Sequence, residues 1–402
     1  MIFVTRCIFF FLAFLLPFGS ANPFNLSVLA DVDGKMVEQM GISPVVFAIA
    51  CICAISDIKI FKNYSRIKKF ILPIVLFYLS LVVASLFYFA PGVSFPIVYL
   101  LKLIAVLAGF FIVSLYFIEY PQTLQISMAI YAYTCFAVIL AFFAGPLQEY
   151  SYVSGGRLWI FGQNPNSFSF LMSLGAVFLA SKFNTENKTP KIVKGVDAIG
   201  IISLLLYIIL SGSRGTFLIV ILCLALLLLK KIVKNIWLTA PLILCVAWGG
   251  FYYYINHEDE ISIFTRLSNT DDDERLTLQK HTIDIFFEYP LLGCGVDGYK
   301  NEMRKRFGEE RDSHNVIVST LGMSGLCGGA SFVTFLFLLG SYSWKRKSHN
   351  ILSIILFIQT LLMSMKTGSV LPYTMMWYTY AMTVALASNK AYKNENSLHL
   401  SS

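Results

Sequence analysis

Apolar runs, each close to the length of a membrane-spanning helix, follow one another along almost the whole chain. They lie at 2–18, 42–56, 70–90, 97–118, 124–144, 167–181, 198–210, 216–229, 236–255, 321–342, 351–365 and 372–388. A helix needs about 20 mainly apolar residues to cross a bilayer core near 30 Å thick. The runs therefore predict an all-α integral membrane protein with about 12 transmembrane helices, and counts from about eleven to thirteen stay open because several runs are short.

The composition excludes a water-soluble domain of this length. Hydrophobic residues make up 57% of the chain, charged residues 13%, and the mean hydropathy is +0.69. Soluble domains carry about 25% charged residues. Because no repeat or low-complexity segment divides the sequence, we expect a single polytopic membrane domain over residues 1–402.

Basic residues gather in a few short loops between the apolar runs. These loops are 59–69, 182–194, 230–234, 345–347 and 390–393. If about twelve spans alternate, all of these loops share one face, which the positive-inside rule makes cytoplasmic. The net charge of +8 is explained in this way and needs no nucleic acid. Segments 145–166, 211–215 and 256–315 then lie on the opposite face.

The first apolar run has a second interpretation. Residues 1–21 resemble a signal peptide, with Arg6, an apolar run and "GSA" before Asn22. Cleavage would remove one span and change no other loop. We expect the first helix to be retained, and the alternative stays open.

The polar segment 256–315 concentrates hydrogen-bonding side chains in an otherwise apolar chain, and we expect it to form a partly helical loop. Aspartates at 271–273 can cap a helix that begins near Glu274 and stops at Pro290. Arg275 then lies in the first turn, with Gln279 one turn later on the same side. The three aspartates also look like a metal site, but no second carboxylate cluster accompanies them, which favours capping.

Three arginines fall on the same non-cytoplasmic face. Arg157 lies in "GGRLWIFGQNPN", Arg214 lies in "SGSRG" between two apolar runs, and Arg275 lies in the long loop. The planar guanidinium fork matches phosphate oxygens, so convergence of these side chains would suit a lipid-linked phosphate or diphosphate. The alternative is interfacial snorkelling or loop salt bridges. Arg214 is the strongest candidate because a five-residue turn confines it.

His314 stands in "DSHN", directly before an apolar helix. A neutral imidazole there could take a proton from a hydroxyl nucleophile near neutral pH. A lone histidine at the start of a helix is more often structural, so both interpretations stay open on local grounds.

The cysteines indicate no metal or redox site, since no CxxC pair occurs. Cys294 and Cys327 lie near the outer face, where a disulfide between them is conceivable.

The order of these motifs resembles a known family. "GGR…NPN", "SRG" between two short apolar runs, "ERL…YPLLGCGVDGY…SHN" and "GMSGLCGG" follow one another across residues 155–329. This arrangement is similar to that of the O-antigen ligase and O-antigen polymerase family of bacterial envelope glycosyltransferases. The resemblance implies a GT-C-like, mostly helical enzyme of the bacterial cytoplasmic membrane that acts on the periplasmic face without a metal ion or cofactor.

The resemblance also implies substrates and residue roles. The donor would be a glycan on undecaprenyl diphosphate, and the acceptor a sugar hydroxyl on lipid A-core or on a second lipid-linked glycan. Arg214 and Arg275 would bind the diphosphate, and His314 would act as base or orient the acceptor. Arg157 and Asn166 are weaker carry-overs as substrate-binding residues. On local grounds, Gln279 would bind substrate beside Arg275. The ring of Tyr299 would stack on a sugar face, although an aromatic belt at the membrane interface explains it equally well. The choice between ligase and polymerase stays open, and so does the binding of a chain-length regulator.

Two other classes of function compete with this interpretation. A transporter or flippase for a lipid-linked oligosaccharide should carry charges deep within several spans, whereas here only Lys102 is deep by sequence. A structural or sensor membrane protein would tolerate substitution of Arg214, Arg275 and His314.

Overall fold

The computed structural model describes residues 1–19, 42–88, 93, 95–154, 157–182, 190–234, 273–308, 310–347, 350–368 and 371–389, without the side chains of 229–234, 273 and 274. The predicted apolar run 236–255 lies outside the described residues. The chain forms two compact units, and each is described by itself. Unit 1 comprises Met1–Thr5, Phe47–Leu124 and Asp272–Ser402, and unit 2 comprises Arg6–Val46 and Gln125–Asp271.

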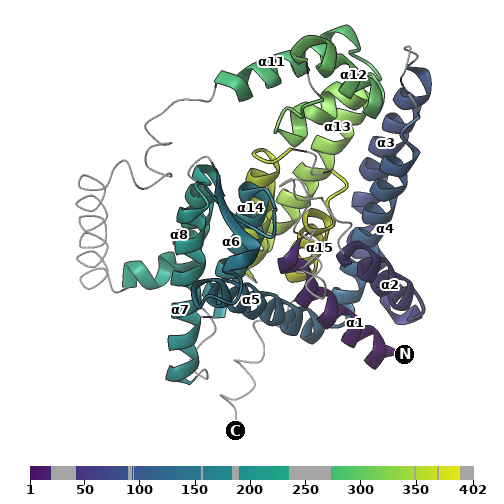
Figure 1. The fold of residues 1–402 in the computed structure, drawn as a ribbon. Coiled ribbons are helices and arrows are strands. Elements are labelled where there is room, and N and C mark those ends of the chain that lie inside the picture. The colour runs from purple at the N-terminus through teal and green to yellow at the C-terminus, as the bar shows by residue number, and fades with distance from the viewer. Residues whose placement is uncertain are drawn as a thin grey trace. The chain divides into compact units, whose positions relative to one another are not determined.

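Almost every described element is a helix (Figure 1). In chain order the elements are α1 (Ile2–Leu15), η1 (Leu16–Phe18), α2 (Ser43–Ile55), η3 (Ile58–Asn63), α3 (Tyr64–Phe87), α4 (Ile97–Glu119), α5 (Pro121–Phe143), η4 (Gln148–Tyr150), β1 (Ser151–Ser154), β2 (Arg157–Ile160), α6 (Pro165–Lys182), α7 (Lys191–Leu210), α8 (Arg214–Lys234), α11 (Asp273–Glu288), α12 (Gly295–Phe307), α13 (Val316–Lys345), α14 (Ile351–Ser364) and α15 (Thr374–Ser388). Each predicted apolar run within the described residues falls on a helix.

The predicted class, a helical membrane protein, agrees with the lengths and apolarity of these helices. Five described segments are long and apolar enough to cross a bilayer: Ile58–Phe87, Ile97–Glu119, Pro121–Phe143, Lys191–Leu210 and Val316–Lys345. Shorter apolar helices accompany them at Ile2–Phe18, Ser43–Ile55, Arg214–Leu228 and Ile351–Ser364. The predicted total of about 12 spans and the GT-C-like arrangement stay predictions.

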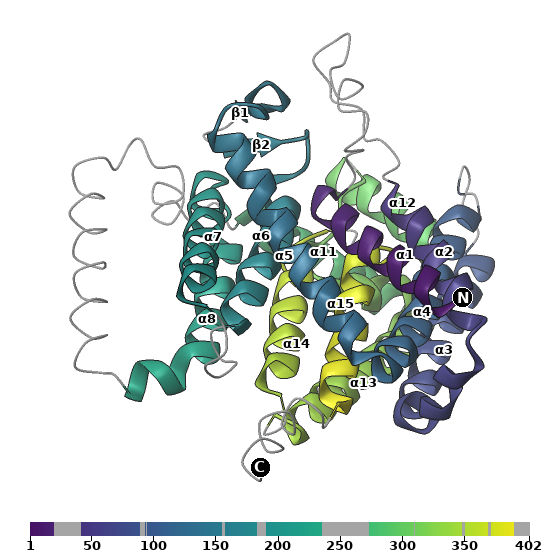
Figure 2. The same cartoon turned by 90° about the horizontal axis from the view of Figure 1, so that it is seen from below.

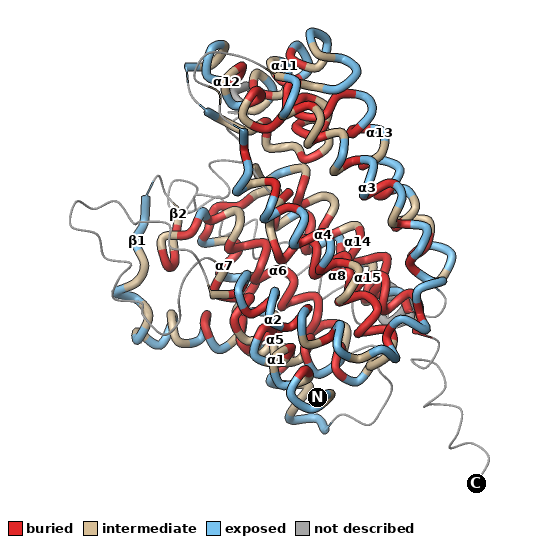
Figure 3. The backbone as a smooth tube through the Cα atoms, turned by 90° about the vertical axis from the view of Figure 1, so that its right-hand side faces the viewer, coloured by how far each residue is buried: buried red, intermediate tan, exposed pale blue. Residues whose placement is uncertain are grey.

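Unit 1 is built on two helix pairs, α3 with α13 and α4 with α15. Aromatic rings fill the space between them: Phe110 lies 5.5 Å from Phe335, which lies 5.6 Å from Trp377. Burial along α3 is one-sided (Figure 3), since Phe77 is fully buried while Phe87 is 71% exposed. An exposed apolar side on a long helix suits contact with lipid rather than water.

The polar segment before α13 is partly helical, as predicted, and α11 and α12 both pack against α13 (Figure 1). The packed face of α11 carries Leu278, Thr282 and Ile285, each at most 1% exposed. Leu276 and Phe287 are also apolar, but they are 52% and 70% exposed. Two apolar stripes run along this helix, and contact with α13 decides which one is buried.

Unit 2 is organised around α6, which packs against α7, α8 and β2 and is buried along nearly its whole length. A short antiparallel hairpin of β1 and β2 precedes it (Figure 2) and pairs Ser154 with Arg157. Within the hairpin Tyr152 stacks on Trp159 with ring centroids 5.6 Å apart, a cross-strand pair that stabilises short sheets. No strand is predicted in this segment from the sequence.

Candidate active site

The turn that carries Arg214 joins α7 to α8 in unit 2. Gly212 adopts a φ of +63°, which glycine takes without steric cost. The buried Ser211 hydroxyl accepts hydrogen bonds from the Ser169 hydroxyl at 2.6 Å and from the Ser213 N–H at 3.3 Å. Arg214 is the first residue of α8 and is half-buried. An anion at this turn would be favoured both by the guanidinium and by the positive end of the helix dipole.

Arg157 and Asn166 contact the same turn from β2 and α6. Arg157 Nε donates to the carbonyl oxygen of Ser211 at 2.9 Å, and Arg157 Nη2 donates to Asn166 Oδ1 at 2.8 Å. The Ser213 hydroxyl donates to that Asn166 oxygen at 3.0 Å. The structure therefore brings both predicted residues to the turn of Arg214, where their polar groups bind the protein itself. This arrangement suits holding the turn better than binding a glycan.

Arg275 and Gln279 lie on α11 in unit 1. The helix begins at Asp273 and ends at Glu288, so the prediction of a helix with Arg275 in its first turn is confirmed. Both side chains are half-buried, and their spacing of four residues places them on one face of the helix.

Of the aspartates ahead of Arg275, Asp271 and Asp272 lie outside the described residues. Within the described part of the chain, no group of three or more His, Cys, Asp or Glu residues could hold a metal ion. The capping role of Asp271 and Asp272 stays a prediction.

Tyr299 on α12 connects the segments on either side of it. Its hydroxyl contacts the Thr282 hydroxyl at 2.9 Å and accepts a hydrogen bond from the Ser313 N–H at 3.2 Å. Burial, the larger cause, and the negative charge of Asp312 together raise the pKa of Tyr299 to about 12. The side chain is 3% exposed, so its ring offers no face to a sugar. Tyr299 instead ties α11 and α12 to the residue before His314.

His314 immediately precedes the cap of α13. The Asn315 side-chain oxygen accepts hydrogen bonds from the N–H groups of Ile317 and Val318 at 3.1 and 3.3 Å, the usual role of an N-cap residue. His314 has a φ of +54°, a region that histidine enters more often than most residues but which is still uncommon. The half-buried His314 is thus held in an unusual backbone conformation at a capped helix start.

Asp312 lies beside His314 and is not among the site residues predicted from the sequence. Its Oδ1 accepts hydrogen bonds from the Ser319 hydroxyl at 2.5 Å and from the His314 N–H at 3.1 Å. A Cβ added to Gly368 would lie 3.1 Å from His314 Nδ1 and 3.2 Å from Asp312 Cβ, so the Gly368 backbone packs against both. The sequence pattern that could have pointed to Asp312 is its position two residues before the histidine in "DSHN". At that spacing an aspartate side chain often accepts a hydrogen bond from the backbone.

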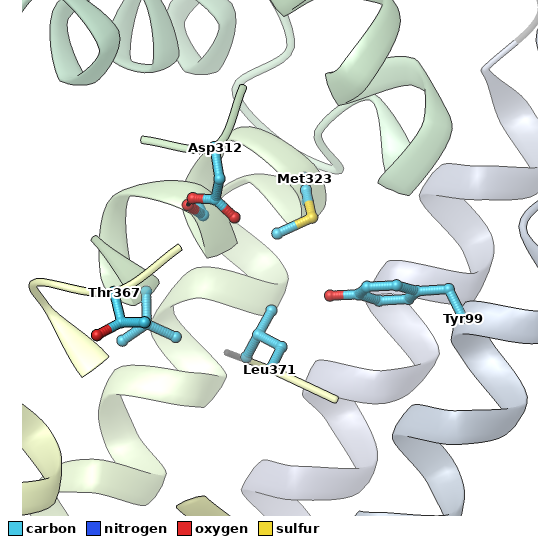
Figure 4. A pocket seen from close by; sticks show the side chains of 7 residues that line it. Tyr99, Asp312, Met323, Thr367 and Leu371 are labelled. Atoms are coloured by element: carbon cyan, nitrogen blue, oxygen red, sulfur yellow. Dashed lines mark hydrogen bonds between the residues drawn. The ribbon is translucent and has the colours of Figure 1, made fainter. Parts of the chain in front are cut away.

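A cavity of about 10 Å³ adjoins Asp312, and its lining includes Tyr99, Met323, Thr367 and Leu371 (Figure 4). Figure 4 shows the Asp312 carboxylate and the Tyr99 hydroxyl directed towards the same space from different elements. A space of this size holds about one water-sized group.

Backbone contacts between two glycine-containing segments support this region. α13 is kinked at Gly325, with φ 58° and ψ −159°. A Cβ on Gly325 would lie 2.5 Å from the Leu291 carbonyl, and a Cβ on Gly293 would lie 2.5 Å from the Met323 carbonyl. The link between α11 and α12 therefore packs directly on the backbone of α13, which only glycine permits.

The two cysteines near this region are not joined to each other. Cys294 and Cys327 are both free thiols, so the conceivable disulfide does not form. Cys294 Sγ lies 3.5 Å from the carbonyl oxygen of Gly322, and burial raises the pKa of this thiol to about 12.

Comparison with known protein families found a matching family model. Residues 199–333 match the family model described as O-antigen ligase. Over this segment the chain is similar to the O-antigen ligase family. The matched segment runs from α7 into α13 and contains Arg214, Arg275 and His314, while Arg157 and Asn166 precede it. No curated protein and no solved structure matched the chain.

Similarity to the O-antigen ligase family over this segment indicates the general activity. It implies an enzyme of polysaccharide biosynthesis that transfers glycosyl groups, with lipid-linked glycan and polysaccharide acceptor as substrates in general. Together with the apolar helices, it also indicates a membrane protein.

Proposed function

We propose that the protein is a multi-pass enzyme of the bacterial cytoplasmic membrane that transfers a glycan from undecaprenyl diphosphate to a sugar hydroxyl at the periplasmic face. The acceptor is a lipid A-core sugar in a ligase or a second lipid-linked glycan in a polymerase. The acceptor oxygen attacks the anomeric carbon with inversion. The bond to the diphosphate breaks, and the lipid diphosphate leaves with the electron pair.

The observation that carries this proposal is the family match itself. A single matched segment, 199–333, contains Arg214, Arg275 and His314, the residues that the sequence motifs indicate for diphosphate binding and for the acceptor. These residue types suit the chemistry, because a leaving diphosphate needs charge stabilisation more than it needs a proton.

The local structure of each arginine supports its assignment. Arg214 opens α8, and Arg275 lies in the first turn of α11. Helix starts favour anions through their N–H groups and dipoles, and guanidinium groups add charge-assisted hydrogen bonds to phosphate. Arg214 and Arg275 would therefore stabilise the charge that develops on the diphosphate, and no metal ion is needed in this scheme.

The remaining predicted residues take supporting roles. Gln279 shares the face of α11 with Arg275 and would bind the same substrate. His314 would orient the acceptor hydroxyl or take its proton. Arg157 and Asn166 would hold the turn of Arg214.

The test is the lipopolysaccharide gel profile of a deletion strain complemented with wild type, Arg214→Ala, Arg275→Ala or His314→Ala. Losing one charge-stabilising group should lower turnover about 10²- to 10³-fold. Loss of the whole ladder with accumulation of lipid-linked polymer indicates a ligase, and a single-repeat band indicates a polymerase. Arg304→Ala, which removes an arginine with a 60% exposed side chain on neighbouring α12, is the matched control. Immunoblots check membrane levels.

A normal ladder from well-inserted variants would refute the residue assignment. Purified protein in detergent separates the enzyme from a flippase, because no membrane then divides two compartments. Product formed from lipid-linked donor and acceptor under those conditions supports the transferase, and its absence supports the transporter alternative.

A further inference from the structure

Asp312 is a carboxylate that hydrogen bonds hold beside His314. Its Oδ1 accepts hydrogen bonds from the Ser319 hydroxyl and from the His314 N–H. Ser319 is 2% exposed and also contacts the buried Ser313 hydroxyl at 2.7 Å. Buried networks in which each member has a partner hold side chains in one orientation.

The same network reaches the helix that carries Arg275. The Thr282 hydroxyl contacts the Tyr299 hydroxyl, which accepts the hydrogen bond from the Ser313 N–H. Thr282 lies two turns after Arg275 on one face of α11, a separation of about 10 Å along the axis. Asp312 is thereby held at a defined place relative to the first turn of α11.

The cavity gives Asp312 a space in which to act. Its carboxylate and the Tyr99 hydroxyl face a space of about 10 Å³ (Figure 4), which Thr367 also lines. That volume accommodates about one hydroxyl-sized group. Gly368 packs against the His314 imidazole and the Asp312 Cβ, so both side chains lie against the same stretch of backbone.

We propose that Asp312 is a further catalytic residue, which accepts the proton of the acceptor hydroxyl while His314 orients that hydroxyl. This inference rests on the proposed glycan transfer. The acceptor oxygen forms its bond to the anomeric carbon as the bond to the diphosphate breaks. The diphosphate leaves with the electron pair, and the proton passes to Asp312. A positioned carboxylate base contributes about 10²- to 10⁴-fold to such a step.

Asp312→Asn separates this role from a structural one. The asparagine oxygen still accepts both hydrogen bonds, but the side chain no longer takes up a proton. We expect purified Asp312→Asn to lose about 10²-fold or more in kcat with the donor KM nearly unchanged. A structural role predicts nearly normal kcat, and that result would overturn the inference. Glu310→Gln, in the same loop with a 42% exposed side chain, is the matched control.

A second variant tests the base directly. Asp312→Ala should regain turnover when formate or azide is added, because a small base can enter the vacated space. Failure of both small bases to raise its rate would count against the proposal. If neither Asp312 variant reaches the membrane, Ser319→Ala is tested in their place. This variant keeps the Asp312 carboxylate and removes the Ser319 hydroxyl that donates a hydrogen bond to it. Its kcat should fall about tenfold, and an unchanged kcat would overturn the inference.

Failure of the wider proposal looks different. Wild-type protein that transfers nothing from a lipid-linked donor refutes the proposed function and this role together. Wild-type protein that transfers normally, beside an equally active Asp312→Asn, refutes only the role of Asp312.

Discussion

Arg157 shows how a single side chain can organise three elements in this protein. Its fork joins β2 to the end of α7 through Ser211 and to the start of α6 through Asn166. The guanidinium thereby supports the turn of Arg214 without needing a substrate. Arg157 could act through its positive charge on a substrate or through the geometry of its guanidinium group on the turn. These two roles predict different results for substitution by lysine.

We expect Arg157→Lys to lose nearly as much activity as Arg157→Ala. Lysine keeps the positive charge but cannot reach Ser211 and Asn166 at once, because it is a point donor on a flexible stem. The lost charged hydrogen bonds should cost about 1.5–3 kcal/mol of stability, measured as a lower thermal midpoint in detergent. Full activity of Arg157→Lys beside an inactive Arg157→Ala would favour phosphate binding by Arg157 instead.

A buried carboxylate in unit 2 makes a second prediction for single residues. Asp197 on α7 is 1% exposed, accepts a hydrogen bond from the Tyr133 hydroxyl at 2.8 Å, and lies 3.7 Å from Lys182 Nζ. Asp197→Ala should cost about 3 kcal/mol, near the lower end for a broken buried pair because Lys182 is partly exposed. Lys182→Met combined with Asp197→Leu should recover much of the thermal midpoint. No recovery in the double variant would mean that the Tyr133 contact dominates.

Among the elements, the kink in α13 depends on glycine at two facing positions. Gly325→Ala and Gly293→Ala should each cost about 3 kcal/mol or more, because the new Cβ meets backbone atoms that cannot move away. Gly308 also has a positive φ, at +81°, but a Cβ there meets nothing within 4 Å. Gly308→Ala is therefore the matched control, with an expected cost of about 1 kcal/mol. Equal thermal midpoints for all three variants would contradict direct backbone packing.

Glu302 on α12 links this helix to the C-terminal end of α3. Its carboxylate accepts hydrogen bonds from the hydroxyl of Tyr88, the residue after α3, at 2.6 Å and from Lys305 of the same helix at 2.8 Å. Burial alone would raise the pKa of Glu302, but these donors and the nearby cations lower it below the usual 4.5. A depressed folded pKa stabilises the protein above the unfolded pKa, and this stabilisation is lost as the pH falls through the folded value.

The thermal midpoint of wild type should therefore exceed that of Glu302→Gln at neutral pH. The difference should shrink as the pH falls below about 4.5. A difference that stays constant from neutral to acidic pH would show that ionised Glu302 does not fasten α12.

For the whole molecule, the orientation in the membrane follows from the basic loops and can be tested with thiol labelling. Val153 in β1 is 71% exposed, and Lys345 at the end of α13 is exposed. In a background without Cys7 and Cys327, which are exposed thiols, Val153→Cys should react with an impermeant reagent in intact spheroplasts. Lys345→Cys should react only after lysis. Labelling of both positions from one side would refute the predicted topology.

Sequence alone predicted the features that depend on local chemistry. Apolar runs form helices in a bilayer whatever their neighbours, because the backbone finds no other hydrogen-bond partners there. The first-turn position of Arg275 followed in the same way from nearby residues. So did the place of His314 before α13 and the turn of Arg214, and the order of these motifs also led to the family.

Tertiary structure alone decided which of these residues meet. The buried face of α11, the contacts of Arg157 and the place of Asp312 beside Gly368 and the cavity depend on segments far apart in the chain. Periodicity shows that a helix has apolar stripes but not which stripe finds a partner. Motif spacing likewise shows which side chains are available, whereas packing determines whether Tyr299 binds a sugar or holds a loop.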